Sequence, residues 1–157
     1  MTSAQFKQFA PTGDLSVEES TTLHASPADV WAMIGTFADL DWHPAIIRTE
    51  IVEGLPGSIG AIRQLTTGDG AVINEELLWQ NDAGHMLIYR IVESPLPVDN
   101  YVSEMELTPD GDYCRFTWRS RFDAKEGVSD GEALDVISGI YRAGIETLLN
   151  KFGGTRH

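Results

Sequence analysis

The sequence has little cysteine and no long apolar run. Its single cysteine, Cys114, excludes an intramolecular disulfide and a zinc site built from several cysteines. No stretch approaches the length of about 18 apolar residues that a membrane-spanning helix needs, and the N-terminus lacks the cationic start and apolar run of a secretory signal. We therefore expect a cytoplasmic protein without membrane insertion, whose fold is held together by packing.

Basic residues are also scarce. The chain has 11 Lys and Arg against 24 Asp and Glu, which gives a formal net charge of -13. Such a chain repels nucleic-acid backbones and anionic lipid surfaces, so neither is expected as a partner. The only lysines are Lys7, Lys125 and Lys151, in a tail, a loop and a helix end, which excludes a cavity lysine for Schiff-base chemistry.

Several motifs of catalysis and cofactor binding are missing. The sequence contains no HExxH, no GxGxxG, no Walker loop and no GxSxG elbow. No three His, Asp or Glu residues converge on one predicted face, so no metal site is expected. We predict a protein without a metal or nucleotide cofactor.

The residues that are present predict one α+β domain over 1–157, because about 150 residues is the usual size of a single domain. Residues 1–13 read as a flexible tail or an early edge strand. A strand at 15–24 precedes a helix that starts at Ser26-Pro27, and a second short helix is predicted at 37–43. Six further strands between 46 and 122 make about seven antiparallel strands in all.

The chain ends in a long predicted helix. Ser129 and Glu132 form a capping box, and apolar residues at spacings of three and four continue to Phe152. A helix of this length extends roughly 34 Å and can cross a whole curved sheet. Its interior glycines, Gly139 and Gly144, each cost about 1 kcal/mol relative to alanine. Either close helix–sheet packing or space for a ligand explains them.

The turns predict which residues face each other across the hairpins. A turn centred on Asp69 pairs Leu65 with Ile73 and Arg63 with Glu75. A turn centred on Ala83 pairs Trp79 with Leu87, Leu77 with Tyr89 and Glu75 with Ile91. Arg63 and Glu75 then lie side by side in an apolar face. A shift of one residue would instead pair Arg63 with Glu76 on the surface.

The last two strands add an aromatic face. A four-residue turn at 109–112 pairs Met105 with Phe116, Ser103 with Trp118 and Tyr101 with Ser120, and the face ends in Phe122. The terminal helix offers Val136, Ile140, Tyr141 and Gly144 to it.

The order of these elements resembles the helix-grip fold of START-like and Bet v 1-like proteins, the SRPBCC superfamily. The resemblance covers about residues 15–152, and its most specific stretches are SPADVWAMIGTFADLDWHPAI, GAIRQL, NEELLWQND and YRIVESPLPVDNY. These stretches look like the bacterial polyketide cyclase/dehydrase branch and are also similar to plant abscisic acid receptors. The resemblance implies a curved sheet around the C-terminal helix, and a cavity between them for lipids, polyketides, steroids or hormones.

The same resemblance implies roles for individual residues. Glu75 would be the cavity-facing carboxylate, Tyr89 and Tyr101 would line the cavity, and loops 66–71 and 93–98 would flank its mouth. Arg48 falls near the receptors' hormone-binding lysine. The receptors' gate and latch sequences are replaced here at 66–71 and 93–97, so their hormone-gated switch is not expected.

Two functions remain open. The first is binding, carriage or lipid transport of a small hydrophobic molecule, and the second is polyketide cyclase- or dehydratase-like catalysis with an acid or base and an enolate stabiliser. The oligomeric state, monomer or homodimer, is undetermined. His43 reads either as an acid/base or as a residue that packs under a loop. Candidate catalytic residues are Glu75, Arg63 and His43. Candidate ligand-binding residues are Trp42, Arg63, Glu75, Leu77, Tyr89, Tyr101, Ser103, Trp118, Phe122, Ile140, Tyr141 and Gly144, with Gly68, Leu96 and Pro97 in the gate loops.

Overall fold

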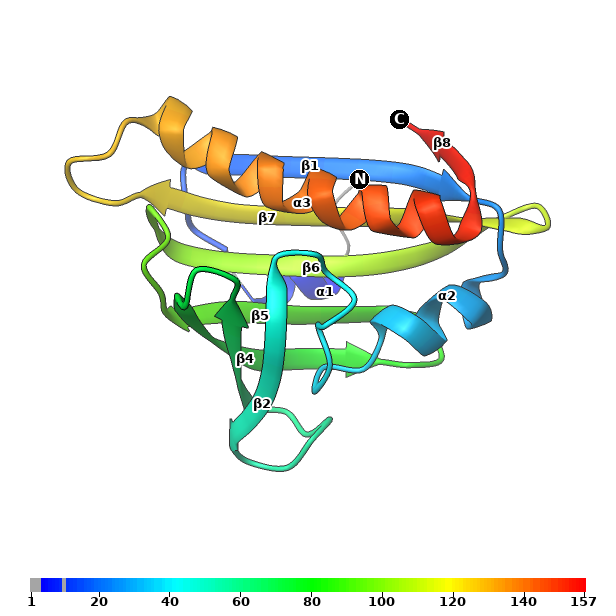
Figure 1. The fold of residues 1–157 in the computed structure, drawn as a ribbon, viewed down its shortest axis with the longest axis horizontal. Coiled ribbons are helices and arrows are strands. Elements are labelled where there is room, and N and C mark those ends of the chain that lie inside the picture. Colours follow the sequence, from blue (N-terminus) through cyan, green and yellow to red (C-terminus); the bar gives the residue numbers. More distant parts are fainter. Residues whose placement is uncertain (1–3, 10) are drawn as a thin grey trace.

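An antiparallel sheet curves around one long helix in the computed structural model, which describes residues 4–9 and 11–157 (Figure 1). The sheet has eight strands within the described residues, in the order β2-β3-β4-β5-β6-β7-β1-β8. The strands are β1 (Leu15–Leu23), β2 (Ile46–Glu53), β3 (Ile62–Thr67), β4 (Val72–Asn81), β5 (Met86–Glu93), β6 (Val98–Asp110), β7 (Tyr113–Ala124) and β8 (Gly154–Arg156). This is the predicted α+β helix-grip fold, with one strand more than expected.

The long helix α3 (Asp130–Phe152) begins and ends where its sequence predicts. The Ser129 hydroxyl accepts a hydrogen bond from the Glu132 N–H at 3.1 Å, and Gly153 ends the helix with a positive φ of 75°. The helix lies along β1 and β7 (Figure 1). Its buried face consists of Ala133, Ile137, Tyr141, Gly144, Ile145 and Leu148. Because α3 lies over these two strands, the inner face of β3–β5 is left for other contacts.

One of the two short helices predicted after β1 is absent. Helix α2 (Pro27–Ile34) forms, with the Ser26 hydroxyl capping the Asp29 N–H at 3.2 Å. Residues 37–43 form turns instead of a second helix. The Asp39 carboxylate accepts from the Asp41 N–H at 2.9 Å, and this local side-chain bond competes with helical hydrogen bonding.

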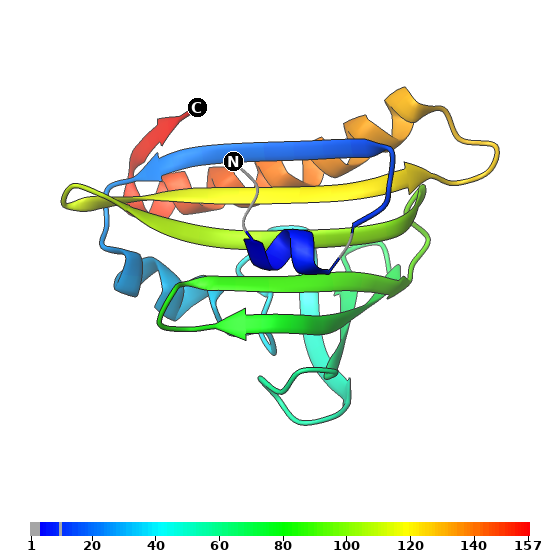
Figure 2. The same ribbon diagram turned by 180° about the vertical axis from the view of Figure 1, so that it is seen from behind.

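The two ends of the chain also differ from expectation. Residues 4–8 form a short helix, α1, rather than an edge strand, and Figure 2 shows it on the outer face of the sheet. Phe6 is buried there. Residues 1–3 and 10 of the predicted tail lie outside the described residues. The final strand β8, which was not predicted, pairs with β1, with Thr21 opposite Arg156.

The register of the central hairpins agrees with prediction where the site lies. Arg63 pairs with Glu75, Glu75 with Ile91 and Leu77 with Tyr89. A β-bulge after Leu77 then places Trp79 opposite Ile88 instead of Leu87.

The β6–β7 pairing lies two residues from the predicted register. Met105 pairs with Trp118 and Ser103 with Ser120, because the turn closes tightly and Asp110 is opposite Tyr113. A shift of two residues leaves every side chain on the predicted face of the sheet.

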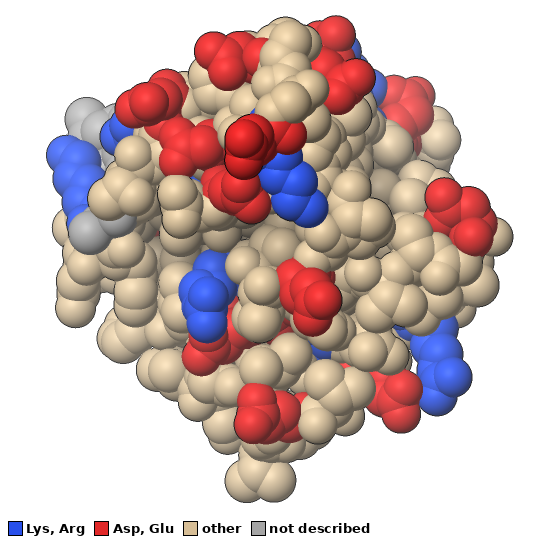
Figure 3. Space-filling view, turned by 90° about the vertical axis from the view of Figure 1, so that its left-hand side faces the viewer, with Lys and Arg blue, Asp and Glu red and all other residues tan. Residues whose placement is uncertain are grey.

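The surface reflects the acidic composition. On the face in Figure 3, acidic side chains outnumber basic ones. No helix within the described residues is long and apolar enough to cross a membrane.

Candidate functional site

A cavity of about 620 Å³ lies between α3, the inner face of the sheet and the turns at 40–46. Its size falls within the range of small-molecule sites, and most of its wall is apolar. Eight of the predicted site residues line it: His43, Gly68, Glu75, Tyr89, Leu96, Tyr101, Trp118 and Ile140. Residues of both predicted flanking loops, 66–71 and 93–98, contribute to the wall.

The remaining candidates do not line this cavity. They are Trp42, Arg63, Leu77, Pro97, Ser103, Phe122, Tyr141 and Gly144. Several of them form the layer behind the wall: Leu77, Phe122 and Tyr141 are fully buried in the hydrophobic core. The prediction placed them at the ligand because inward-facing side chains of a sheet and a helix cannot be divided by sequence alone into core and cavity wall.

Arg63 and Glu75 form a buried ion pair at the cavity. They are only 1% and 6% exposed. Arg63 Nε and Nη2 both donate to Glu75 Oε1, at 2.9 and 2.7 Å, and Nη1 donates to the Phe37 carbonyl at 3.0 Å. The guanidinium also lies 4.2 Å from the centre of the Phe37 ring. Arg63 is therefore held behind the cavity wall, and Glu75 is its cavity-facing partner.

The environment of Glu75 changes its acidity. Burial raises the pKa of Glu75, and the charge and hydrogen bonds of Arg63 partly offset this effect. Both Arg63 bonds go to Oε1, and Oε2 receives no hydrogen bond from any described residue. One carboxylate oxygen is thus available to a molecule in the cavity.

A network of hydroxyl groups lies beside this pair. The Tyr89 and Tyr101 hydroxyls are 3.3 Å apart, Tyr101 bonds to Tyr141, and Tyr141 lies 2.9 Å from Ser103 Oγ. The Trp118 ring stacks on that of Tyr141 at 4.2 Å. Burial raises the pKa of Tyr89 to about 12 and those of Tyr101 and Tyr141 well above the ordinary value. All three hydroxyls stay protonated at neutral pH.

His43 is bound to the backbone through both ring nitrogens. The Ala45 N–H donates to Nδ1 at 3.1 Å, so Nε2 carries the hydrogen and donates to the Ile140 carbonyl at 2.7 Å. Burial lowers the pKa of His43 and favours this neutral form. The geometry fits a residue that ties the 40–46 turns to α3, and it offers no free nitrogen for an acid/base role.

Close packing explains one of the two glycines in α3. A Cβ atom on Gly144 would lie 3.0 Å from His43 Cδ2 and 3.0 Å from Trp118 Cζ3. Gly144 therefore brings the helix against two cavity-wall residues instead of leaving space for a ligand. A Cβ on Gly139 would meet nothing within 4 Å, and nothing in the structure explains that glycine.

Sequence reasoning missed much of the apolar wall. Beyond the predicted mouth loops and Val136, which were expected near the cavity, the wall contains Leu40, Pro44, Ala45, Ile46, Leu65, Ile73, Ile91 and Ile137, none of which was named as a ligand-binding residue. The hairpin register already placed Leu65, Ile73 and Ile91 on the face that carries Glu75, and this signal could have found them. The 40–46 turns carry no periodic pattern that marks them as a wall.

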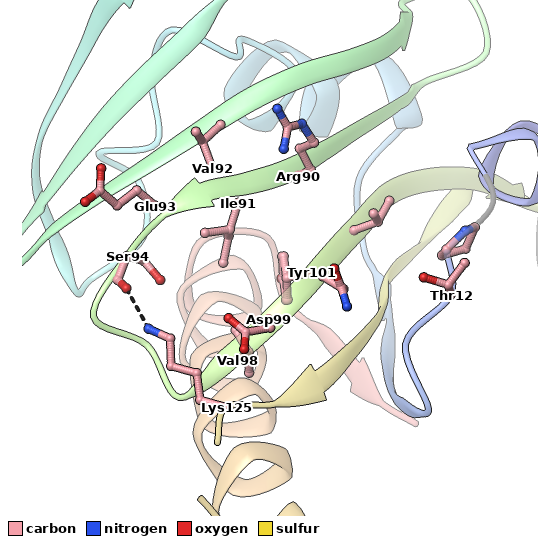
Figure 4. A pocket seen from close by; sticks show the side chains of 13 residues that line it. Thr12, Arg90, Ile91, Val92, Glu93, Ser94, Val98, Asp99, Tyr101 and Lys125 are labelled. Atoms are coloured by element: carbon pink, nitrogen blue, oxygen red, sulfur yellow. Dashed lines mark hydrogen bonds between the residues drawn. The ribbon is translucent and has the colours of Figure 1, made fainter. Parts of the chain in front are cut away.

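A second hollow, of about 510 Å³, lies where β5 and β6 separate (Figure 4). Their pairing ends at Arg90 and Val102, and Asn100 has a positive φ of 54° beyond that point. Ile91 and Tyr101 contribute to both this hollow and the cavity. Charged side chains, among them Arg90, Glu93, Asp99 and Lys125, line the hollow, so it suits an apolar ligand less well than the cavity does.

Comparison with known proteins agrees with this architecture. Residues 14–153 match the family model described as polyketide cyclase / dehydrase and lipid transport. The chain belongs to this family. None of the curated proteins matches the chain.

Solved structures of several bacterial proteins share the family fold. The protein XoxI from Bacillus cereus is 34% identical, with a TM-score of 0.80 over 87% of this chain and 94% of that one. An uncharacterized protein from Bacillus thuringiensis is 32% identical, with a TM-score of 0.80 over 88% and 98%. A protein from Nitrosospira multiformis is 26% identical, with a TM-score of 0.77 over 88% and 96%. The family and its fold support a ligand-binding or cyclase-like role.

No group of three or more His, Cys, Asp or Glu within the described residues could hold a metal ion.

Proposed function

We propose that the protein binds a small, largely apolar molecule bearing one or two polar groups, of polyketide, aromatic or lipid type, in the cavity between the sheet and α3. The observation that carries this proposal is an apolar cavity of about 620 Å³ with a buried carboxylate in its wall. Burying an ionised group costs free energy even when it is paired, and a shape-matched apolar pair would fill the space as well. Hydrogen bonding of a ligand to Glu75 would explain why a buried ion pair is present at the cavity.

Binding or carriage is favoured over catalysis because the site lacks a complete set of reactive groups. Both nitrogens of His43 bond to the backbone, and Arg63 is committed to Glu75 and Phe37.

Part of the proposal is a cytoplasmic location, supported by the single cysteine, Cys114, which is free and buried.

A cyclase- or dehydratase-like enzyme is the second candidate. One observation favours it: Glu75 lines the cavity, its Oε2 accepts no hydrogen bond from a described residue, and burial raises its pKa, as expected of a general base. In this function Glu75 would remove a proton from a carbon next to a carbonyl. Neither Arg63, held behind the wall, nor a tyrosine has a free hydrogen for the resulting enolate oxygen.

Native mass spectrometry of gently purified protein tests both candidates. For a binding protein we expect one small molecule per chain, recovered unchanged after incubation, and loss of the bound mass in Glu75→Gln. Glu76→Gln is the matched control, because Glu76 lies on the other face of β4 and pairs with the exposed Arg90. Chemical conversion of the captured molecule that Glu75→Gln abolishes would favour the enzyme. A crystal structure with side chains filling the cavity would contradict both.

A further inference from the structure

The hydroxyl network beside the cavity has a fixed direction. The Ser103 hydroxyl donates its only hydrogen to the Arg119 carbonyl at 3.0 Å. Tyr141 must then donate to Ser103 Oγ, 2.9 Å away. Tyr101 in turn donates to Tyr141, and Tyr89 donates to Tyr101 at 3.3 Å. Each hydroxyl passes its hydrogen to the next, and the chain ends on a backbone carbonyl.

The other end of the chain is fixed by an indole. Trp118 Nε1 can only donate, and it lies 3.1 Å from the Tyr89 hydroxyl oxygen and 3.1 Å from Ser103 Oγ. The indole donor at Tyr89 and the carbonyl acceptor at Ser103 therefore agree on one direction of hydrogen donation, from Tyr89 toward Ser103. Tyr89 and Tyr101, which line the cavity, have no uncommitted hydrogen and can offer only oxygen lone pairs.

The other polar side chains of the wall follow the same pattern. His43 donates from Nε2 to the Ile140 carbonyl, and at the mouth the Thr67 hydroxyl donates to Asp69. Glu75 accepts both Arg63 bonds on Oε1 and leaves Oε2 open. Every side-chain hydrogen-bond donor in the wall is used within the protein, whereas Glu75 Oε2, on the carboxyl group that pairs with Arg63, is left as a free acceptor.

From this imbalance we infer that the ligand bound in the proposed function is a hydrogen-bond donor, an alcohol, phenol or enol whose O–H is accepted by Glu75 Oε2. A ketone, ester or ether would leave Oε2 unpaired in an apolar cavity, and it could gain a hydrogen bond from Tyr89 or Tyr101 only if the Tyr89–Tyr101 link or the next bond of the network broke. Leaving a buried acceptor unpaired costs binding free energy, so the cavity discriminates by the ligand's hydrogen and not by its size.

Two probes that differ by one methyl group test this inference. In calorimetric titrations at pH 8, 2-naphthol should bind the wild-type protein at least about tenfold more tightly than 2-methoxynaphthalene, a difference of about 1.4 kcal/mol, because hydrogen bonds to charged groups are stronger than those between neutral groups. In Glu75→Gln the amide oxygen stays on Arg63 and the amide N–H₂ faces the cavity. We expect the preference to disappear or reverse, while Glu76→Gln keeps the wild-type preference.

The outcomes separate the inference from the proposed function. Equal affinity of the wild type for both probes, or a preference that persists in Glu75→Gln, would overturn the inference and leave the proposed function standing. If neither probe binds, both the inference and the proposed function are overturned. If circular dichroism shows Glu75→Gln to be unfolded, the double variant Arg63→Met/Glu75→Leu, which lacks both charges, should bind the two probes equally. A naphthol preference in that variant would also overturn the inference.

Discussion

Arg63 and Glu75 show at the scale of single residues how the cavity site is held. Two charges leave water beside an apolar cavity, and their attraction must offset a large loss of hydration. Arg63 gains the Phe37 carbonyl and contact with the Phe37 and Tyr89 rings, at 4.2 and 5.0 Å. Glu75 gains only Arg63. Each charge therefore depends on the other, but the fold does not depend on either charge as such.

This dependence predicts unequal effects of single and double substitution. Glu75→Leu leaves the Arg63 charge buried without its partner, so it should lower the free energy of unfolding by about 3–5 kcal/mol. The double variant Arg63→Met/Glu75→Leu removes both charges and should recover most of that loss. Urea unfolding followed by circular dichroism measures both values. A double variant as unstable as the single one would contradict this account of the pair.

How far the sequence predicts the site depends on what fixes each residue. The turn around Asp69 fixes the Arg63–Glu75 register, so that pair could be predicted from local sequence. The bulge after Leu77 could not, because nothing in the local pattern marks the extra residue that moves Trp79. Tyr141 was expected at the ligand but lies in the core, since α3 turns that face toward β1 and β7. Tertiary packing, which local patterns do not encode, decides such cases.

At the scale of elements, α3 joins the core to the cavity wall. His43 and Trp118 line the cavity, and both contact the helix closely at Gly144. The hydrogen bond from His43 to the Ile140 carbonyl fixes the turns at 40–46 against the same helix. A displacement of α3 at Gly144 would therefore move two wall residues together. The exposed Gly139, only five residues earlier, has no such contacts.

The two glycines of α3 form a matched pair for experiment. Gly139→Ala should raise the free energy of unfolding by up to about 1 kcal/mol, because alanine favours the helix and its Cβ meets nothing. Gly144→Ala should lower it by about 1–3 kcal/mol, because its Cβ presses on His43 and Trp118. Denaturant unfolding of both variants checks the signs. Stabilisation by Gly144→Ala would show that the cavity wall yields without cost.

At the scale of the whole molecule, the net charge of -13 contributes to solubility and opposes folding. Some carboxylates form ion pairs, such as Glu18 and Glu104, which both pair with Arg119. Many others are exposed, and among these Asp112, Glu126 and Asp135 form no ion pair with a described residue. Bringing such charges together in a folded chain costs more than leaving them apart in an unfolded one. Salt should reduce that difference.

We therefore expect the thermal midpoint to rise when NaCl increases from about 0.02 M to about 0.3 M, as the Debye length falls from about 20 Å to about 6 Å. The triple variant Asp112→Lys/Glu126→Lys/Asp135→Lys should have a midpoint about 2–4 °C higher at low salt, if the lost repulsion amounts to about 1 kcal/mol. It should also respond less to salt than the wild type. Sucrose at matched osmolality controls for general solute effects. A wild-type midpoint that falls with salt would show that attractive pairs such as Arg119–Glu104 outweigh the repulsion among the exposed carboxylates.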